Sequence, residues 1–173
     1  MATSRMNYRA WISPPVEHEA RPPYREHYPV TLCNGARLHL PLQPLPDGER
    51  AIALLMSNQC PFEVEQELSV LLSVLAAEFS AEVIVGIPTL GLNYARNVAR
   101  NLGFPDYVAS AAAAIELVQS TGAQVIGLCV VLIEGEAWKT VLEALAPDWP
   151  DRIRGLGRLP LFRSTAAGWV PVI

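Results

Sequence analysis

Residues 81–103 read AEVIVGIPTLGLNYARNVARNLG, and this stretch decides the fold class. Val83 to Pro88 is a continuous apolar run, typical of a strand that is buried on both faces. A short loop follows at Thr89 to Gly91, and the residues from about Leu92 to Leu102 have helical spacing. In open α/β sheets, ligands bind beyond the carboxyl ends of the strands. The loop after Pro88 is therefore the first place to look for a site.

Strands and helices alternate on both sides of this corner. Upstream, an apolar stripe from Val64 to Phe79 predicts a helix that Ser57 or Asn58 caps, with Pro61 in its first turn. Downstream, the pattern predicts four further elements. They are a strand stub at Tyr107-Val108, a helix at Ala111 to Ser120, a buried strand at Gln124 to Ile133 and a helix at Glu136 to Leu145. This alternation predicts an α/β fold with parallel βαβ units and helices on both faces of the sheet.

A β-hairpin is expected before the first helix. Tyr28 to Leu42 carries alternating leucines in its second half, and Asn34-Gly35 favours a type I′ turn, which needs positive φ at both central residues. Leu45 to Gly48 predicts a second turn, and Ala51 to Met56 a short buried strand.

The two ends of the chain differ in character. Residues 1–27, Met1 to His27, contain four prolines and much charge, which favours an extended arm over a helix. Leu159 to Phe162 and Trp169 to Val172 predict a closing hairpin. We therefore expect an arm at 1–27 and one compact domain at 28–173, which agrees with a length of 173 residues.

Composition excludes several classes of protein. A net charge of −4 supplies no basic face for a nucleic acid, and the longest apolar runs fall short of the ~20 residues that a membrane helix needs. Three separated cysteines, Cys33, Cys60 and Cys129, indicate neither a disulfide framework nor a metal site. No secretory leader is apparent at the N-terminus. We expect a soluble cytoplasmic protein that contacts neither a membrane nor a nucleic acid.

The sequence from Gly86 to Leu92, followed by Ala95 on a helix, resembles the first strand, loop and helix of the type I phosphoribosyltransferases. It is most similar to the group related to adenine phosphoribosyltransferase. The segments Leu40 to Phe62 and Leu161 to Pro171 are similar to that family's entry into the core and to its last hairpin. The resemblance covers about Tyr28 to Val108 and Ser110 to Ile173.

This resemblance implies a type I phosphoribosyltransferase-like parallel sheet flanked by helices, with hairpins at both ends. It also implies transfer of ribose 5-phosphate from phosphoribosyl pyrophosphate (PRPP) to a purine-like base, with Mg²⁺ accompanying PRPP, in a homodimer. The loop Pro88, Thr89, Leu90 and Gly91 matches the family's pyrophosphate loop, and Ser110 is a candidate for the end of its 5-phosphate loop. No residue is assigned a catalytic role, and no protein ligand for a metal is expected.

The family's strand ending in two acidic residues, with the phosphate loop behind it, has no counterpart in this sequence. No Asp-Asp or Glu-Asp pair occurs, and the predicted helix at Ala111 follows almost directly after Val108. Three explanations are open: residues missing from the sequence, a short form in which Tyr107 to Ala109 replaces the strand, or a wrong alignment. The alternative function is accordingly a non-catalytic binding or assembly module that kept the scaffold.

Simpler interpretations stand beside these. The loop before Leu92 also fits an ordinary βα turn, and Ser110 fits a helix N-cap. His18, His27 and His39 lack metal spacing and are expected in surface or half-buried structural roles. Other residues have equally simple roles: inert core for Cys129, solvated loop acids for Glu134 and Glu136, and packing for Trp138 and Trp149.

Overall fold

The computed structural model describes residues 9–16, 20–87, 90–105, 108–109, 119, 122–144 and 147–172. The chain forms two compact units. Unit 1 comprises residues 1–64 and 157–173, and unit 2 comprises residues 65–156. Among the described residues, no helix has the length and apolar character needed to cross a membrane.

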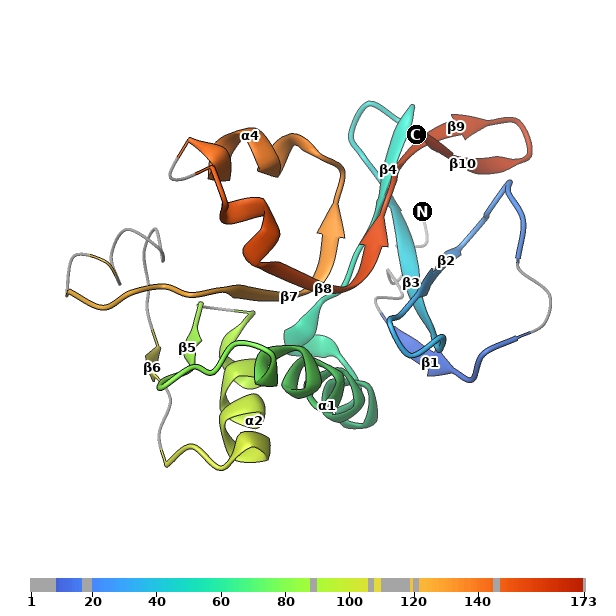
Figure 1. Ribbon diagram of the computed structural model, residues 1–173. Coiled ribbons are helices and arrows are strands. Elements are labelled where there is room, and N and C mark those ends of the chain that lie inside the picture. The colour runs from blue at the N-terminus through green and yellow to red at the C-terminus, as the bar shows by residue number, and fades with distance from the viewer. Residues whose placement is uncertain are drawn as a thin grey trace. The chain divides into compact units, whose positions relative to one another are not determined.

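Unit 1 is built on a six-stranded sheet in which all the described pairs are antiparallel (Figure 1). Its path runs β1-β3-β4-β9-β10, and β2 pairs with β3. The strands are β1 (Trp11–Ser13), β2 (His27–Thr31), β3 (Arg37–Pro44), β4 (Arg50–Ala53), β9 (Leu161–Thr165) and β10 (Gly168–Val172). Both predicted hairpins are therefore present. β1 and the bridge between Tyr24 and Trp169 come from the predicted arm, so that segment takes part in pairing.

Alternation along β3 separates a buried face from an outer one. Leu38 and Leu40 are fully buried, whereas Arg37 and His39 lie on the opposite face and are only half-buried. Successive side chains of a strand point to opposite faces, so the leucine pattern selects which face packs inward. The burial of Leu38, Leu40 and their neighbours fixes the register of the hairpin.

The turn of the first hairpin differs from the type I′ prediction. Leu32 N donates to Ala36 O over 2.9 Å, which leaves a three-residue loop from Cys33 to Gly35. Gly35 has a φ of 83°, whereas no residue other than glycine has a positive φ in the described part of the chain. Asn34 instead accepts a hydrogen bond from the Ala36 amide on its side-chain oxygen. An Asn-Gly pair also suits this longer loop, in which only the glycine is left-handed.

Unit 2 contains the predicted central corner. Its elements are most of α1 (Phe62–Ala77), β5 (Val85–Gly86), α2 (Leu92–Leu102), β6 (Val108–Ala109), β7 (Leu128–Glu134), α4 (Ala137–Glu143), the 3-10 helix η2 (Trp149–Arg152) and the first half of β8 (Ile153–Leu159). β5 and β6 are parallel, with α2 between them in sequence, and β7 pairs with β8. The chain is therefore a mixed α/β protein, and α2 has the predicted bounds.

The described residues do not confirm the extended parallel sheet: β5 and β6 pair in parallel, but each is only two residues long. The strand expected from Val83 to Pro88 is reduced to Val85–Gly86, and Val83 and Ile87 are exposed. The strand expected at Gln124 is β7, which starts at Leu128 and is half-buried. An apolar run becomes a strand that is buried on both faces only if other elements cover both faces of its sheet. Most of the helix predicted at Ala111 to Ser120 lies outside the described residues.

Two other boundaries are corrected, and one further strand is present. Ser57 and Asn58 belong to a 3-10 turn, η1 (Ser57–Gln59), and α1 begins only after Pro61. The missing N–H of a proline suits the residue just before or at the start of a helix. The strand expected from Ala51 to Met56 ends at Ala53, and β8 was not predicted. The seven-residue sequence of β8, IRGLGRL, contains two glycines and two arginines. It therefore shows neither a clear alternation of apolar and polar residues nor a continuous apolar run.

A polar seam joins α1 to α2, which lie side by side in Figure 1. The Asn97 amide donates to the Glu65 carboxylate at 3.1 Å and to Ser69 Oγ at 3.2 Å. One turn further on, the Asn101 amide donates to Ser73 Oγ at 3.0 Å. The partners advance in the same order along both helices: Asn97 contacts Glu65 and Ser69, and Asn101 contacts Ser73. The two helices therefore run in the same general direction.

Hydrogen bonds offset the cost of burying the two serines of this seam. Ser69 Oγ donates to the carbonyl of Glu65, and Ser73 Oγ donates to the carbonyl of Ser69, both at 2.7 Å. Each hydroxyl therefore has an acceptor within its own helix and uses a lone pair to accept from an asparagine. Small side chains at these positions also let the two helices approach closely.

Replacing Asn97 by Ala should lower the free energy of unfolding by about 1–3 kcal/mol, because the Glu65 carboxylate and the buried Ser69 hydroxyl lose a half-buried donor. Urea denaturation followed by circular dichroism measures this. Asn93→Ala is the matched control on the same helix, since Asn93 is exposed and reaches Glu65 only at 3.5 Å. Equal losses for the two variants would contradict the role assigned to the seam.

Candidate functional site

The strand β5 and the helix α2 pack together unusually closely. A Cβ atom on Gly86 would lie 2.8 Å from the Ala95 Cβ and 3.2 Å from Leu92 Cδ2. Only glycine fits where the helix crosses the strand so closely. The corner is therefore built by a small residue on each element, Gly86 on β5 and Ala95 on α2.

Gly91 closes the loop and starts the helix. Its amide donates to the carbonyl of Ile87 at 3.0 Å, and its own carbonyl accepts from the Ala95 amide at 3.0 Å. A Cβ atom at this position would lie 2.6 Å from Ile87 O, so a side chain would force the turn open. The Gly91 N–H is thus engaged inside the loop and does not point to a ligand.

The structure places two of the five sequence-predicted site residues. Leu90 is exposed beside the N-terminus of α2, and Gly91 is the N-cap residue. Pro88, Thr89 and Ser110 lie outside the described residues. Whether the predicted loop and Ser110 converge on one ligand therefore stays a prediction.

The N-terminus of α2 has the electrostatic character of an anion site. Its cap is a glycine, so no N-cap side chain occupies the first helical turn, and that turn contains no acidic residue of its own. The nearest carboxylate given for it is that of Glu65 on α1, which lies 3.5 Å from the Asn93 amide. The helix contains Arg96 and Arg100 and no carboxylate. Aligned peptide dipoles place partial positive charge at this end, which favours an anion.

The residues that were given simpler roles are described as follows. Cys129 is half-buried on β7 and is not part of the core, but burial raises the pKa of its thiol to about 11, so the thiol is protonated and unreactive at neutral pH. Glu134 is exposed, and Glu136 forms an ion pair with Lys139. Trp149 is fully packed, while Trp138 is half-buried and donates to the Gly135 carbonyl at 3.0 Å.

A second cluster, on unit 1, was missed by the sequence reasoning. The Trp11 ring stacks on His39 with centroids 4.6 Å apart, and it meets His27 edge-on at the same distance. His39 Nε2 also lies 2.9 Å from Ser13 Oγ. Strand parity could have placed His27 and His39 on one face, but only the pairing of β1 with β3 brings Trp11 and Ser13 to them.

No group of three or more His, Cys, Asp or Glu side chains suited to a metal ion occurs in the part of the chain that the structure describes. His18 lies outside that part. Comparisons with protein families, with curated proteins and with solved structures give no match for this chain. The site must therefore be interpreted from its own residues.

Gly86→Ala should destabilise the protein by about 1–3 kcal/mol through overpacking against Ala95. Adding Ala95→Gly removes the Cβ atom with which the new side chain at position 86 would clash. The double variant should therefore recover part of the lost stability, despite the poorer helix propensity of glycine. Urea unfolding of the wild type, both single variants and the double variant measures the coupling between the two positions. Strict additivity of the two changes would contradict the close contact.

His39 predicts a pH dependence of stability. Burial, followed by the positive charges of His27 and Arg37, lowers the pKa of His39 below its ordinary 6.5. The unfolded chain then binds a proton at this residue more readily than the folded chain, so stability is full above pH 6.5 and falls as the pH drops below it. His39→Asn should flatten the decrease in the free energy of unfolding between pH 7 and 5. An unchanged slope in this variant would assign the decrease to other groups.

Proposed function

We propose that this protein is a phosphoribosyltransferase-like domain whose β5–α2 corner accepts the diphosphate of PRPP. The resemblance of the sequence from Gly86 to Ala95 suggests this activity. Its main structural support is the parallel unit β5-α2-β6, in which a glycine-dependent turn leads into a helix whose first turn has no acidic residue. Such a helix start suits a phosphate ester.

The loop's hydrogen bonds limit how a diphosphate can bind. Pro88 has no N–H, and the N–H of Gly91 is engaged with Ile87. A diphosphate would therefore use other N–H groups of the loop and of the start of α2, or it would open the bond between Gly91 and Ile87. Binding by the second route would be coupled to a change in the turn.

The proposed reaction is a displacement at the anomeric carbon of ribose. A ring nitrogen of the purine-like base forms the new C–N bond while the C–O bond to pyrophosphate breaks, and pyrophosphate leaves with that electron pair. The base loses its ring N–H proton to solvent, so the product base is neutral. Mg²⁺ bound with PRPP would balance the phosphate charge. The chain's own contribution would be to position the diphosphate at α2 and to stabilise the leaving anion.

The second candidate function is a module that binds the anion without transfer. It is favoured by a feature of the sequence, which contains no adjacent pair of acidic residues to hold the ribose hydroxyls. Such a module would retain the β5–α2 corner and bind PRPP or pyrophosphate without releasing a product.

Calorimetric titration of the full chain with Mg²⁺-PRPP, and separately with Mg²⁺-pyrophosphate, tests binding. Leu90→Glu introduces a negative charge at an exposed position beside the start of α2 and should weaken binding at least tenfold. Gln66→Glu is the control, because it makes the same charge change at an exposed position on α1. No heat at millimolar ligand, or equal weakening in both variants, would remove the proposed site.

Release of pyrophosphate from PRPP in the presence of adenine, guanine or hypoxanthine tests transfer. Turnover that Leu90→Glu abolishes supports the enzyme. Binding that is sensitive to Leu90→Glu, with no pyrophosphate released, assigns the chain to the non-catalytic module instead.

A further inference from the structure

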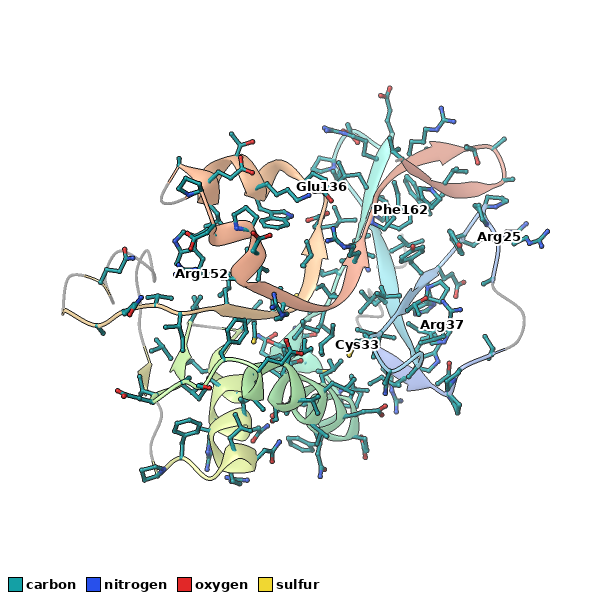
Figure 2. The ribbon with its side chains drawn as sticks, viewed as in Figure 1. Arg25, Cys33, Arg37, Glu136, Arg152 and Phe162 are labelled. Carbon is teal, nitrogen blue, oxygen red and sulfur yellow. The ribbon has the colours of Figure 1, made fainter. Side chains whose placement is uncertain are left out.

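The tip of the β2–β3 hairpin carries the only Asn-Gly pair in the sequence, Asn34-Gly35. We use the name hairpin tip for the three-residue loop from Cys33 to Gly35, which the pair Leu32–Ala36 closes. Cys33, the first residue of this loop, is labelled in Figure 2. Cys33 and Asn34 are both exposed, so water reaches their side chains. The hairpin tip belongs to unit 1 and is independent of the corner discussed above.

An asparagine that precedes a glycine is open to attack on its own side chain. The backbone nitrogen of the following residue can bond to the asparagine Cγ, because the five-membered ring that results has little strain. Glycine favours this step, since it has no Cβ atom to shield its nitrogen and its backbone turns more freely. In the described part of the chain, each of the other asparagines precedes a residue that has a Cβ atom. They are Asn58 in η1 and Asn93, Asn97 and Asn101 on α2.

Two hydrogen bonds at the hairpin tip act on the two groups that would react. The Ala36 amide donates to Asn34 Oδ1 at 3.1 Å, which draws electron density from Cγ and makes this carbon more open to attack. Gly35 N donates to Leu32 O at 2.9 Å, so the nitrogen is engaged until the loop opens. Loops open locally at a much lower free energy than the whole fold. The reaction therefore needs a local opening of the hairpin tip and not the unfolding of unit 1.

The one Asp-Gly pair of the sequence, Asp47-Gly48, is held in an unreactive form. Asp47 accepts from the Glu49 and Arg50 amides at 3.0 and 3.1 Å, and it forms an ion pair with Arg50 at 2.8 Å. The hydrogen bond from the Arg50 side chain is the main cause that lowers the pKa of this carboxyl. An ionised carboxylate is a poor electrophile, because its charge repels a nucleophile. The two pairs therefore differ, and Asn34 is the reactive one.

We propose that Asn34 is a site of spontaneous covalent modification, at which the asparagine becomes an aspartate or an isoaspartate. Gly35 N attacks Asn34 Cγ, and Nδ2 leaves as ammonia together with the proton that Gly35 N loses. The product is a cyclic succinimide. Water then opens the ring by adding either to Cγ, which gives aspartate, or to the backbone carbonyl carbon of Asn34, which gives isoaspartate. Water is the only co-reactant.

The two products differ in their effect on the hairpin. Aspartate keeps an oxygen in the place of Oδ1, so the hydrogen bond from the Ala36 amide is retained. Isoaspartate routes the backbone through Cβ and Cγ, which lengthens the hairpin tip by one methylene group. Leu32 and Ala36, which close the tip, are only 3% and 5% exposed. The longer loop strains a pair that belongs to the core, so isoaspartate weakens the β2–β3 hairpin and aspartate does not.

Ageing of the full chain tests the proposal. The protein is incubated at pH 8.5 and 37 °C with a reductant that keeps Cys33 as a thiol, and its peptides are mapped by mass spectrometry over four weeks. Asn34 should exchange ammonia for water several-fold faster than Asn58, while Asp47 stays unchanged. The rate should rise with pH, because the deprotonated nitrogen is the nucleophile. An isoaspartate methyltransferase, which labels isoaspartyl but not aspartyl residues, distinguishes the two products.

Three variants separate the modification from its effect on the fold. Asn34→Ser keeps an oxygen that accepts from the Ala36 amide but cannot form a succinimide, so the hairpin tip should stay unmodified. Asn58→Ser is the matched control, since Asn58 is exposed in the same unit and its replacement should leave the rate at Asn34 unchanged. Asn34→Asp has the charge of the modified protein and a normal backbone. It should melt at the temperature of the fresh wild type, whereas the modified fraction isolated by ion exchange should melt lower in proportion to its isoaspartate content.

The wild-type chain alone decides the outcome if a variant is unfolded. Asn34 that stays intact for four weeks, that reacts no faster than Asn58, or that reacts only when urea unfolds the chain would overturn the proposal. Equal melting temperatures for the isoaspartyl fraction and Asn34→Asp would overturn the effect on the hairpin. None of these measurements uses a ligand, and Leu90→Glu probes unit 2, so failure here is distinguishable from failure of the proposed function.

Discussion

The hydrogen-bonded seam between α1 and α2 is the interaction on which the candidate corner depends. Asn97 and Asn101 donate to Ser69 and Ser73, and each serine also donates to a carbonyl of its own helix. A polar interface between helices tolerates few alternatives, because a shift of one turn separates the asparagine amides from the serine hydroxyls and the carboxylate that accept from them. The seam thus specifies the position of α2 along α1 more strictly than leucine contacts alone would.

With α2 held in this way, the glycine at the end of β5 decides how near the helix lies to the strand. Gly86 allows contact with Ala95, and Gly91 allows the turn to close on Ile87. In the same closed turn the Gly91 N–H donates to Ile87, so this amide is not available to an anion. A corner with a favourable helix dipole and an engaged amide is suited to a ligand that reaches the start of the helix, or that opens the turn as it binds.

The two units differ in charge. Unit 1 carries eight arginines against six carboxylates, and unit 2 carries five basic residues against eleven acidic ones, so the corner in unit 2 relies on backbone dipoles within an acidic unit. Sequence reasoning assigned the histidines surface or half-buried roles because it considered each of them alone. His27 and His39 are 12 residues apart, and Trp11 and His39 are 28 apart, so only the pairing of three strands makes them a cluster.

The sequence alone determined the local elements whose signals lie within one turn or one strand. It predicted α2 with its bounds, both hairpins and the glycine-containing corner, because helical spacing, strand alternation and turn residues act over short distances. Strand extent, sheet neighbours and side-chain clusters were decided by the tertiary structure. The apolar run from Val83 forms only a two-residue strand, since burial on two faces needs partners that an amino-acid pattern does not supply. Packing likewise decided that the Gly91 amide bonds to Ile87, because the distance between two backbone atoms is set by the fold.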